Sequence, residues 1–209
     1  MPAWDFKPWW TGRDVVIIGG GASLIGFDFE RLRGGTILGV NKALCLGSLL
    51  SALYFGDIGR NEYPGALAEW HERLEFLGAP VFVNGAALEA DYPWLFSVPH
   101  KDFGLYTDAI GYNANSGAGA INLALLHGAK RLWLLGFDMK RRIDGMGEWY
   151  PGAVPNFSGW DHWLPRILPF FDFVARDWKI KFKDREIINV NDNSAIKCFP
   201  CVSLKEWKP

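Results

Sequence analysis

A glycine-rich stretch after the first strongly apolar run is the feature of this sequence with the clearest chemistry. In "VVIIGGGASL" three consecutive glycines lead into a small residue and a serine. Glycine lets the backbone turn sharply and approach a ligand closely, and backbone N–H groups at a helix start bind phosphate. We therefore predict a phosphate-binding loop formed by Gly19, Gly20, Gly21, Ala22 and Ser23. A plain tight turn between a strand and a helix is the alternative interpretation.

The loop departs from the two common nucleotide motifs. Gly19 and Gly21 fit the first half of G-x-G-x-x-G, but Leu24 takes the sixth position. Asn41 stands after the second predicted strand, where an acidic residue would bind the ribose of NAD. No G-K-[ST] follows the glycines, so the loop is not a Walker A motif. These departures favour a nucleotide other than NAD and exclude a P-loop ATP site.

The elements that must position this loop alternate between strands and helices. Continuous apolar runs predict strands covered on both faces at 14–19, 36–41, 52–56, 80–84, 131–136 and 186–190. Amphipathic or small-residue patterns predict helices at 61–78, at 116–128 with a serine cap and a stop at Gly128, and at 160–178 with Pro165 and Pro169 early or kinking. We predict one α/β domain over residues 1–209, Rossmann-like, with a mostly parallel sheet and helices on both faces.

An irregular segment, 139–160, separates the last of these helices from the strand before it. It is rich in Gly, Pro, Arg and Trp. Long loops in compact domains often carry function, so we predict an active-site loop here. Tryptophan faces suit sugars and bases, and Trp149 and Trp160 are candidates for lining an acceptor site.

Composition limits the partners and the compartment. The chain has 209 residues, 49% hydrophobic content and a formal net charge of −1, which suits one domain and gives no electrostatic case for nucleic acid. No apolar run is long enough to span a bilayer, and the N-terminus does not resemble a signal peptide. Three cysteines form no disulfide framework, so we expect a cytoplasmic protein; a homo-oligomer is compatible with the sequence. Cys198 and Cys201 form a lone C-x-x-C without a second pair, so no metal site is predicted.

Several short motifs, in order, resemble one Rossmann-type family. It unites the bacterial family 42 sialyltransferases with the archaeal 6-hydroxymethylpterin diphosphokinase-like proteins. The matching positions are Gly19, Gly21, Ser23 and Leu24, then Asn41, then Ser116, Gly117, Gly128, Lys130, Gly136 and Asp138. "VNKAL" and "LYFGD", which ends at Asp57, complete this pattern, and "WKIKF" with "REIINVNDNSAIKCFP" resembles the sialyltransferase ending at the pair Asn193 and Ser194.

This resemblance implies a nucleotide-bound donor, which is a CMP-sugar in the sialyltransferases. The glycine loop would hold the phosphate side, while Asn41 and the turn at Ser116 and Gly117 would hold ribose and base. Asp57 and Asp138 join the predicted nucleotide-binding set. The alternative interpretation of Ser116 is a simple helix cap.

The resemblance also suggests the catalytic groups. His162, in "GWDHWLPR", takes a position matching the sialyltransferase base, with Asp161 as a lesser candidate. An exposed or capping histidine is the alternative. Where the family places its first tyrosine for the leaving phosphate, this chain has Lys140, Arg141 and Arg142, while Tyr150 comes later. Basic side chains can neutralise a departing phosphate, or this run is a solvated loop.

Three functions remain open. The first is a nucleotide-sugar-dependent glycosyltransferase acting on a small-molecule or glycan acceptor without a metal or other cofactor. The second is a pyrophosphotransferase of the hydroxymethylpterin type, which would need Mg²⁺ to bridge phosphates. The third is a binding module that kept the nucleotide pocket without the chemistry.

Overall fold

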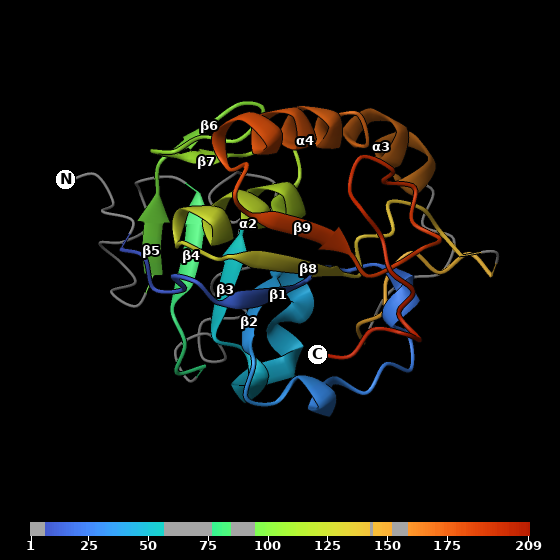
Figure 1. The fold of residues 1–209 in the computed structure, drawn as a ribbon. Helices are drawn as coiled ribbons and strands as arrows, with labels where there is room; N and C mark the ends of the chain where they lie inside the picture. The colour runs from blue at the N-terminus through green and yellow to red at the C-terminus, as the bar shows by residue number, and fades with distance from the viewer. Residues whose placement is uncertain (1–6, 57–76, 85–94, 143, 152–158) are drawn as a thin grey trace.

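A parallel sheet of seven strands forms the centre of the computed structural model (Figure 1). The structure describes residues 7–56, 77–84, 95–142, 144–151 and 159–209. The strand order is β5-β4-β3-β2-β1-β8-β9. The bounds are β1 (Asp14–Ile18), β2 (Thr36–Val40), β3 (Ala52–Phe55), β4 (Val81–Asn84), β5 (Leu95–Val98), β8 (Arg131–Leu135) and β9 (Glu186–Asn189).

Strand β1 marks the point where the chain reverses its direction across the sheet. Val16 of β1 pairs in parallel register with Ile37 of β2 on one side and with Trp133 of β8 on the other. The chain builds outward from β1 to β5 and then returns to add β8 and β9 on the opposite side. In such sheets ligands bind at the carboxyl ends of the strands beside this switch point.

Apolar side chains from both faces of the sheet explain the continuous runs in the sequence. Ile17 belongs to one core cluster, and its neighbour Ile18 belongs to the other. Helices α2 (Ser116–Leu126) and α4 (Phe170–Lys181) cover one face, and the 3₁₀ segments η1 (Ala22–Leu24), η2 (Phe29–Leu32) and η3 (Asn41–Leu49) cover the other (Figure 1). The predicted α/β class, the parallel sheet and the single domain are confirmed.

Two of the predicted helices lie in the described residues, and they differ from the prediction in two respects. The cap of α2 is Asn115, whose side chain accepts from the N–H of Ala118, so the serine cap predicted at Ser116 is wrong by one residue. The helix stops as expected before Gly128, which has a φ of 85°. The predicted helix at 160–178 is two helices, α3 (Gly159–Ile167) and α4, because Pro169 begins the second one.

Three strands were not predicted from the sequence, and one predicted helix lies outside the described residues. Strand β5 and the short pair β6 (His100–Lys101) and β7 (Ile110–Gly111) had no predicted counterpart. The helix predicted at 61–78 lies almost wholly outside the described residues.

His127, at the end of α2, is a fully buried packing residue. Its ring stacks on Trp9 with centroids 4.9 Å apart, and its Nδ1 hydrogen-bonds with the backbone oxygen of Lys7 at 2.6 Å. Burial lowers the pKa of His127 below its ordinary value, and the Lys7 carbonyl offsets only part of this effect. The imidazole is therefore held neutral in the folded protein.

We expect stability to decrease as the pH falls through the unfolded-state pKa of His127, near 6.5. Below that value the unfolded chain binds a proton that the folded protein excludes, at about 1.4 kcal/mol for each unit between the two pKa values. Thermal melts of the wild type and H127Q between about pH 7.5 and 5 check this, because glutamine does not titrate there. Parallel slopes for the two proteins would contradict the assignment.

Candidate functional site

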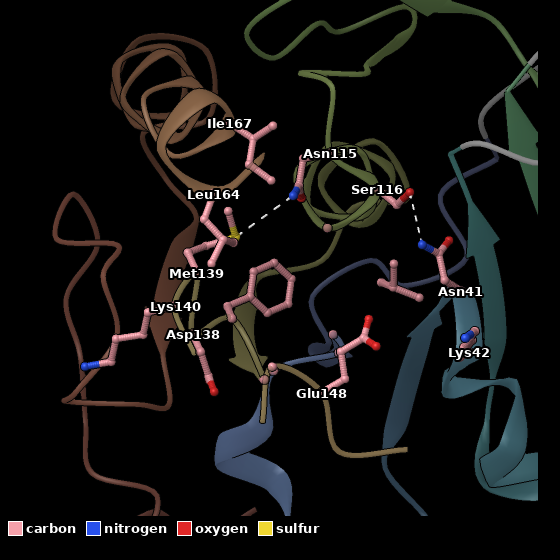
Figure 2. Close-up of a pocket in the computed structure, with 18 of the residues that line it drawn as sticks. Asn41, Lys42, Asn115, Ser116, Asp138, Met139, Lys140, Glu148, Leu164 and Ile167 are labelled. Atoms are coloured by element: carbon pink, nitrogen blue, oxygen red, sulfur yellow. Dashed lines mark hydrogen bonds between the residues drawn. The ribbon is translucent and has the colours of Figure 1, made fainter. Parts of the chain in front are cut away.

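A pocket of about 230 Å³ opens at the switch point, at the carboxyl ends of β1, β2 and β8 (Figure 2). Six segments of the chain build its walls. The residues that line it are Gly19–Gly21, Val40–Lys42, Ala114–Gly117, Gly136–Lys140, Gly147, Glu148, Tyr150, Leu164 and Ile167. The parallel sheet thus brings together most of the predicted nucleotide-binding residues.

The glycine loop is a close joint between the ends of β1 and β8. A Cβ on Gly21 would lie 2.5 Å from Asp138 Cγ and 2.6 Å from the Gly136 oxygen. The N–H of Gly19 donates to Leu135 O at 2.8 Å, and the N–H of Gly21 donates to Gly136 O at 2.8 Å. Glycine is therefore required here for packing, and two of the loop amides are used by the protein itself.

Ser23 and Asp138, both predicted to bind nucleotide, bind each other. Asp138 is 5% exposed and accepts from Ser23 N at 2.7 Å, from Ser23 Oγ at 2.6 Å and from Asn191 Nδ2 at 2.8 Å. One carboxylate therefore ties together the loops after β1, β8 and β9. The segment after the glycines is a single 3₁₀ turn, η1, and so lacks the α-helical dipole on which the phosphate prediction relied.

Asn41 and Ser116 lie side by side at one edge of the pocket, and Asn41 has an unsatisfied acceptor (Figure 2). The Nδ2 of Asn41 donates to Ser116 Oγ at 3.4 Å (Figure 2). Its Oδ1 is buried without a hydrogen-bond partner among the described residues. Asn41 also has a φ of 52°, a left-handed conformation that asparagine tolerates better than most residues. Buried polar atoms are normally paired, so this oxygen is a candidate ligand-binding atom.

The first turn of α2 forms the wall beside Asn41. Because Asn115 caps the helix, Ser116 is the first helical residue, and its hydroxyl accepts from Asn41 at the pocket. Gly117 packs on Phe137, where a Cβ would lie 2.8 Å from the ring. The helix start places partial positive charge at this wall.

Residues 147–151 form a short strand-like cover over the glycine loop. The N–H of Trp149 donates to Gly20 O at 3.1 Å, and its indole Nε1 donates to Gly19 O at 2.7 Å. Trp149 packs on Phe29 in the core, with centroids 4.5 Å apart, and so is absent from the pocket lining. Because side chains alternate along an extended segment, Glu148 and Tyr150 face the pocket.

The pocket holds charges of both signs. Lys42 Nζ lies 4.9 Å from the centroid of the Tyr150 ring, a cation–π contact. Glu148 projects into the middle of the pocket, between Asp138 and Asn41 (Figure 2). No hydrogen bond or ion pair of the Glu148 carboxylate occurs within the described part of the chain. This carboxylate can accept a proton or hydrogen bonds from a ligand.

The three basic residues predicted to stabilise the leaving phosphate have different partners in the structure. Lys140 lines the pocket edge but donates to Asn193 Oδ1 at 2.7 Å, and its amine points away from the centre (Figure 2). Arg141 pairs with the exposed Asp161, with Nη2 2.5 Å from Oδ1. Arg142 pairs with Asp144 at 3.0 Å.

His162 lies outside the pocket in this structure. It is exposed, and its ring makes an edge contact with Trp163, at 6.4 Å between centroids. The residues of α3 that line the pocket are Leu164 and Ile167. At 100° per residue, His162 projects from roughly the opposite face of the helix. Its catalytic role, like that of Asp161, stays a prediction.

Two predicted site residues cannot be placed in the pocket from the described residues, and two pocket residues were not predicted from the sequence. Asp57 lies outside the described residues, and the side chain of Trp160 is not described. Sequence reasoning missed Lys42, although it follows Asn41, and Glu148, although it stands two residues before Tyr150. The signal for Glu148 is its spacing of two residues from Tyr150, which places both side chains on one face of an extended segment.

The two cysteines of the C-x-x-C sequence have different surroundings. Cys198 is half-buried, its Sγ contacts Phe171 O at 3.4 Å, and burial raises the pKa of its thiol to about 11. Cys201 is exposed. Within the described ranges, no group of three or more His, Cys, Asp or Glu residues is placed to hold a metal ion. No described helix is both long and apolar enough to cross a bilayer.

No known family model matches the sequence, and no curated protein matches it. Among solved structures, a variant of the sialyltransferase CST-II in complex with CMP matches with a TM-score of 0.53 at 14% identity, over 91% of this chain and 86% of that chain. The sialyltransferase CstII from Campylobacter jejuni, in complex with the substrate analogue CMP-3FNeuAc, gives a TM-score of 0.49 at 12% identity, over 90% and 84%. The first likeness shows that this chain has a sialyltransferase-like fold.

Proposed function

We propose that this protein is a nucleotide-sugar-dependent glycosyltransferase that uses a CMP-sugar donor. The observation that carries the proposal is the orphaned Asn41 Oδ1, buried beside Ser116 at the switch-point pocket. A buried amide oxygen of this kind needs a donor, and the hydroxyls of a ribose or the amine of a base supply one. The fold shared with a sialyltransferase that was solved with CMP supports this class of ligand.

The size of the pocket favours one nucleotide over a dinucleotide. A volume of about 230 Å³ is below the range of roughly 300–1,000 Å³ that is usual for ligand sites. The residue after β2 also disfavours NAD. Asn41 stands at the position where NAD enzymes have an acidic residue that binds the ribose diol.

The remaining pocket residues suit transfer from a nucleoside phosphate. Tyr150 can donate a hydrogen bond to the leaving phosphate, and Lys42 beside it supplies positive charge. The acceptor hydroxyl must also lose a proton. Glu148 and Tyr150 are pocket groups that can take one, whereas His162, the residue proposed from the sequence, requires a rotation of α3 to reach the pocket.

A thermal-shift panel tests the proposal. We expect CMP, without Mg²⁺, to raise the melting temperature by about 5–10 °C at a concentration near 100 Kd. S116A should lose most of this shift, because its hydroxyl lines the pocket with Asn41. S48A is the matched control, since Ser48 is exposed and outside the pocket.

The other outcomes separate the alternatives. A shift only with ATP and Mg²⁺ would replace the proposal with phosphoryl transfer. Binding of CMP without release of CMP from a CMP-sugar would indicate a binding module. No shift with any of CMP, CDP, UDP, GDP, ADP, ATP or NAD would refute the nucleotide pocket.

A further inference from the structure

Glu148 stands directly over the middle of the glycine loop. A Cβ on Gly20 would lie 3.9 Å from Glu148 Oε1 and 3.5 Å from the Tyr150 ring. The backbone of this cover is fixed, because Trp149 donates to both Gly19 O and Gly20 O. This backbone places the Glu148 carboxylate beside Gly20, at the surface that a ligand on the loop would use.

This place is where a second phosphate lies in related architectures. In Rossmann-type folds the pyrophosphate of a ligand sits on the glycine loop and binds the amides there. In this chain the amides of Gly19 and Gly21 donate to β8 and its following loop, and that of Ser23 donates to Asp138. Three of the five backbone amides of residues 19–23 are therefore unavailable to a phosphate chain.

The charges around the glycine loop also disfavour a phosphate there. The Asp138 carboxylate lies behind Gly21 and the Glu148 carboxylate lies in front of Gly20. Lys42, the pocket cation in contact with Tyr150, lies on the β2 side with Asn41. A phosphate on the glycine loop would meet two carboxylates, while one near Lys42 and Tyr150 would meet a cation and a hydroxyl.

We propose that Glu148 takes the place of a second phosphate on the glycine loop and limits this pocket to ligands with one phosphate, namely nucleoside monophosphates and their sugar esters. The inference rests on the proposed function and specifies its donor class. Nucleoside diphosphate sugars and nucleoside triphosphates are excluded by repulsion from the carboxylate.

Calorimetric titration of the wild type and E148Q with CMP, CDP and CTP, without Mg²⁺ and at fixed ionic strength, tests the inference. The wild type should bind CMP more tightly than CTP. E148Q keeps the shape and removes the charge, so it should improve CTP binding relative to CMP by about tenfold or more, with CDP between them. E148D, which keeps the charge, and E206Q, at an exposed carboxylate outside the pocket, should keep the wild-type order.

The outcomes separate this inference from the proposed function. CMP binding by the wild type with an unchanged CMP-to-CTP ratio in E148Q would leave the proposed function standing and overturn the inference. Preference of the wild type for CTP would also overturn it. If neither protein bound CMP, CDP or CTP, both the inference and the CMP-sugar proposal would be overturned. If only E148Q bound CTP, the inference would be supported. A melting temperature for E148Q within about 2 °C of the wild type confirms that it is folded.

Discussion

G21A should destabilise the protein by about 3 kcal/mol or more, which for a chain of this size lowers the melting temperature by roughly 6–12 °C. The added Cβ would lie 2.5 Å from Asp138 Cγ and 2.6 Å from the Gly136 oxygen. Neither neighbour can move without a large cost in free energy. The Gly136 oxygen belongs to the backbone, and the Asp138 carboxylate is held by three donors. The joint between β1 and β8 would have to open. Thermal or urea unfolding measures the effect.

G20A is the matched control, one residue away in the same loop. Its Cβ would have only ordinary contacts, at 3.5 Å to Tyr150 and 3.9 Å to Glu148. Neither glycine has a positive φ, so the comparison isolates packing from backbone strain. We expect G20A to stay within about 1 kcal/mol of the wild type. Similar losses for G20A and G21A would show that the loop needs glycine for flexibility rather than for the joint.

D138N should cost about 3 kcal/mol, although the substitution conserves shape. The amide has one oxygen for three donors, and its NH₂ group would face either the N–H of Ser23 or the Ser23 hydroxyl together with Asn191 Nδ2. Because Asp138 is buried, water cannot satisfy the donors that lose their partner. Denaturant unfolding reports the loss, and ligand binding should weaken as the three loops separate.

D161N provides the control for an aspartate in an exposed ion pair. Asp161 contacts Arg141 but its side chain is 69% exposed, and such pairs contribute within about 1 kcal/mol. If D138N proved as mild as D161N, with nucleotide binding lost and stability kept, Asp138 would be a ligand contact rather than the tie between loops that its hydrogen bonds indicate.

The class of fold follows from local pattern. Runs such as 14–19 and 131–136 are apolar at every position because Ile17 and Ile18 pack into cores on opposite faces of the sheet. Such runs, separated by amphipathic segments, have few solutions other than a parallel sheet covered by helices. Edge strand β5 lacked this signal, since its two central residues are only half-buried.

The candidate site was only partly predictable, because local pattern locates the ends of strands and helices but not the contacts between distant segments. Asn41, Ser116 and Gly117 end or begin regular elements, and strand ends of a parallel sheet meet at one edge whatever the details of packing. The role of Asp138 was not predictable, because its two partners, Ser23 and Asn191, lie 115 and 53 residues away in sequence. His162 does not line the pocket, because α3 presents Leu164 and Ile167 to it. Glu148, which no sequence motif indicated, lines the pocket beside its bridge to Gly21.

By itself the sequence determined a doubly covered parallel sheet with a small-residue loop, an asparagine and a serine-led helix at one edge, since periodicity and strand order act through near neighbours. Only the tertiary structure decided what these residues do for one another. It directed the amides of Gly19, Gly21 and Ser23 inward, left the Asn41 oxygen without a partner, and placed a carboxylate over Gly20. These features depend on distances of a few ångströms between segments far apart in the chain, which local pattern does not encode.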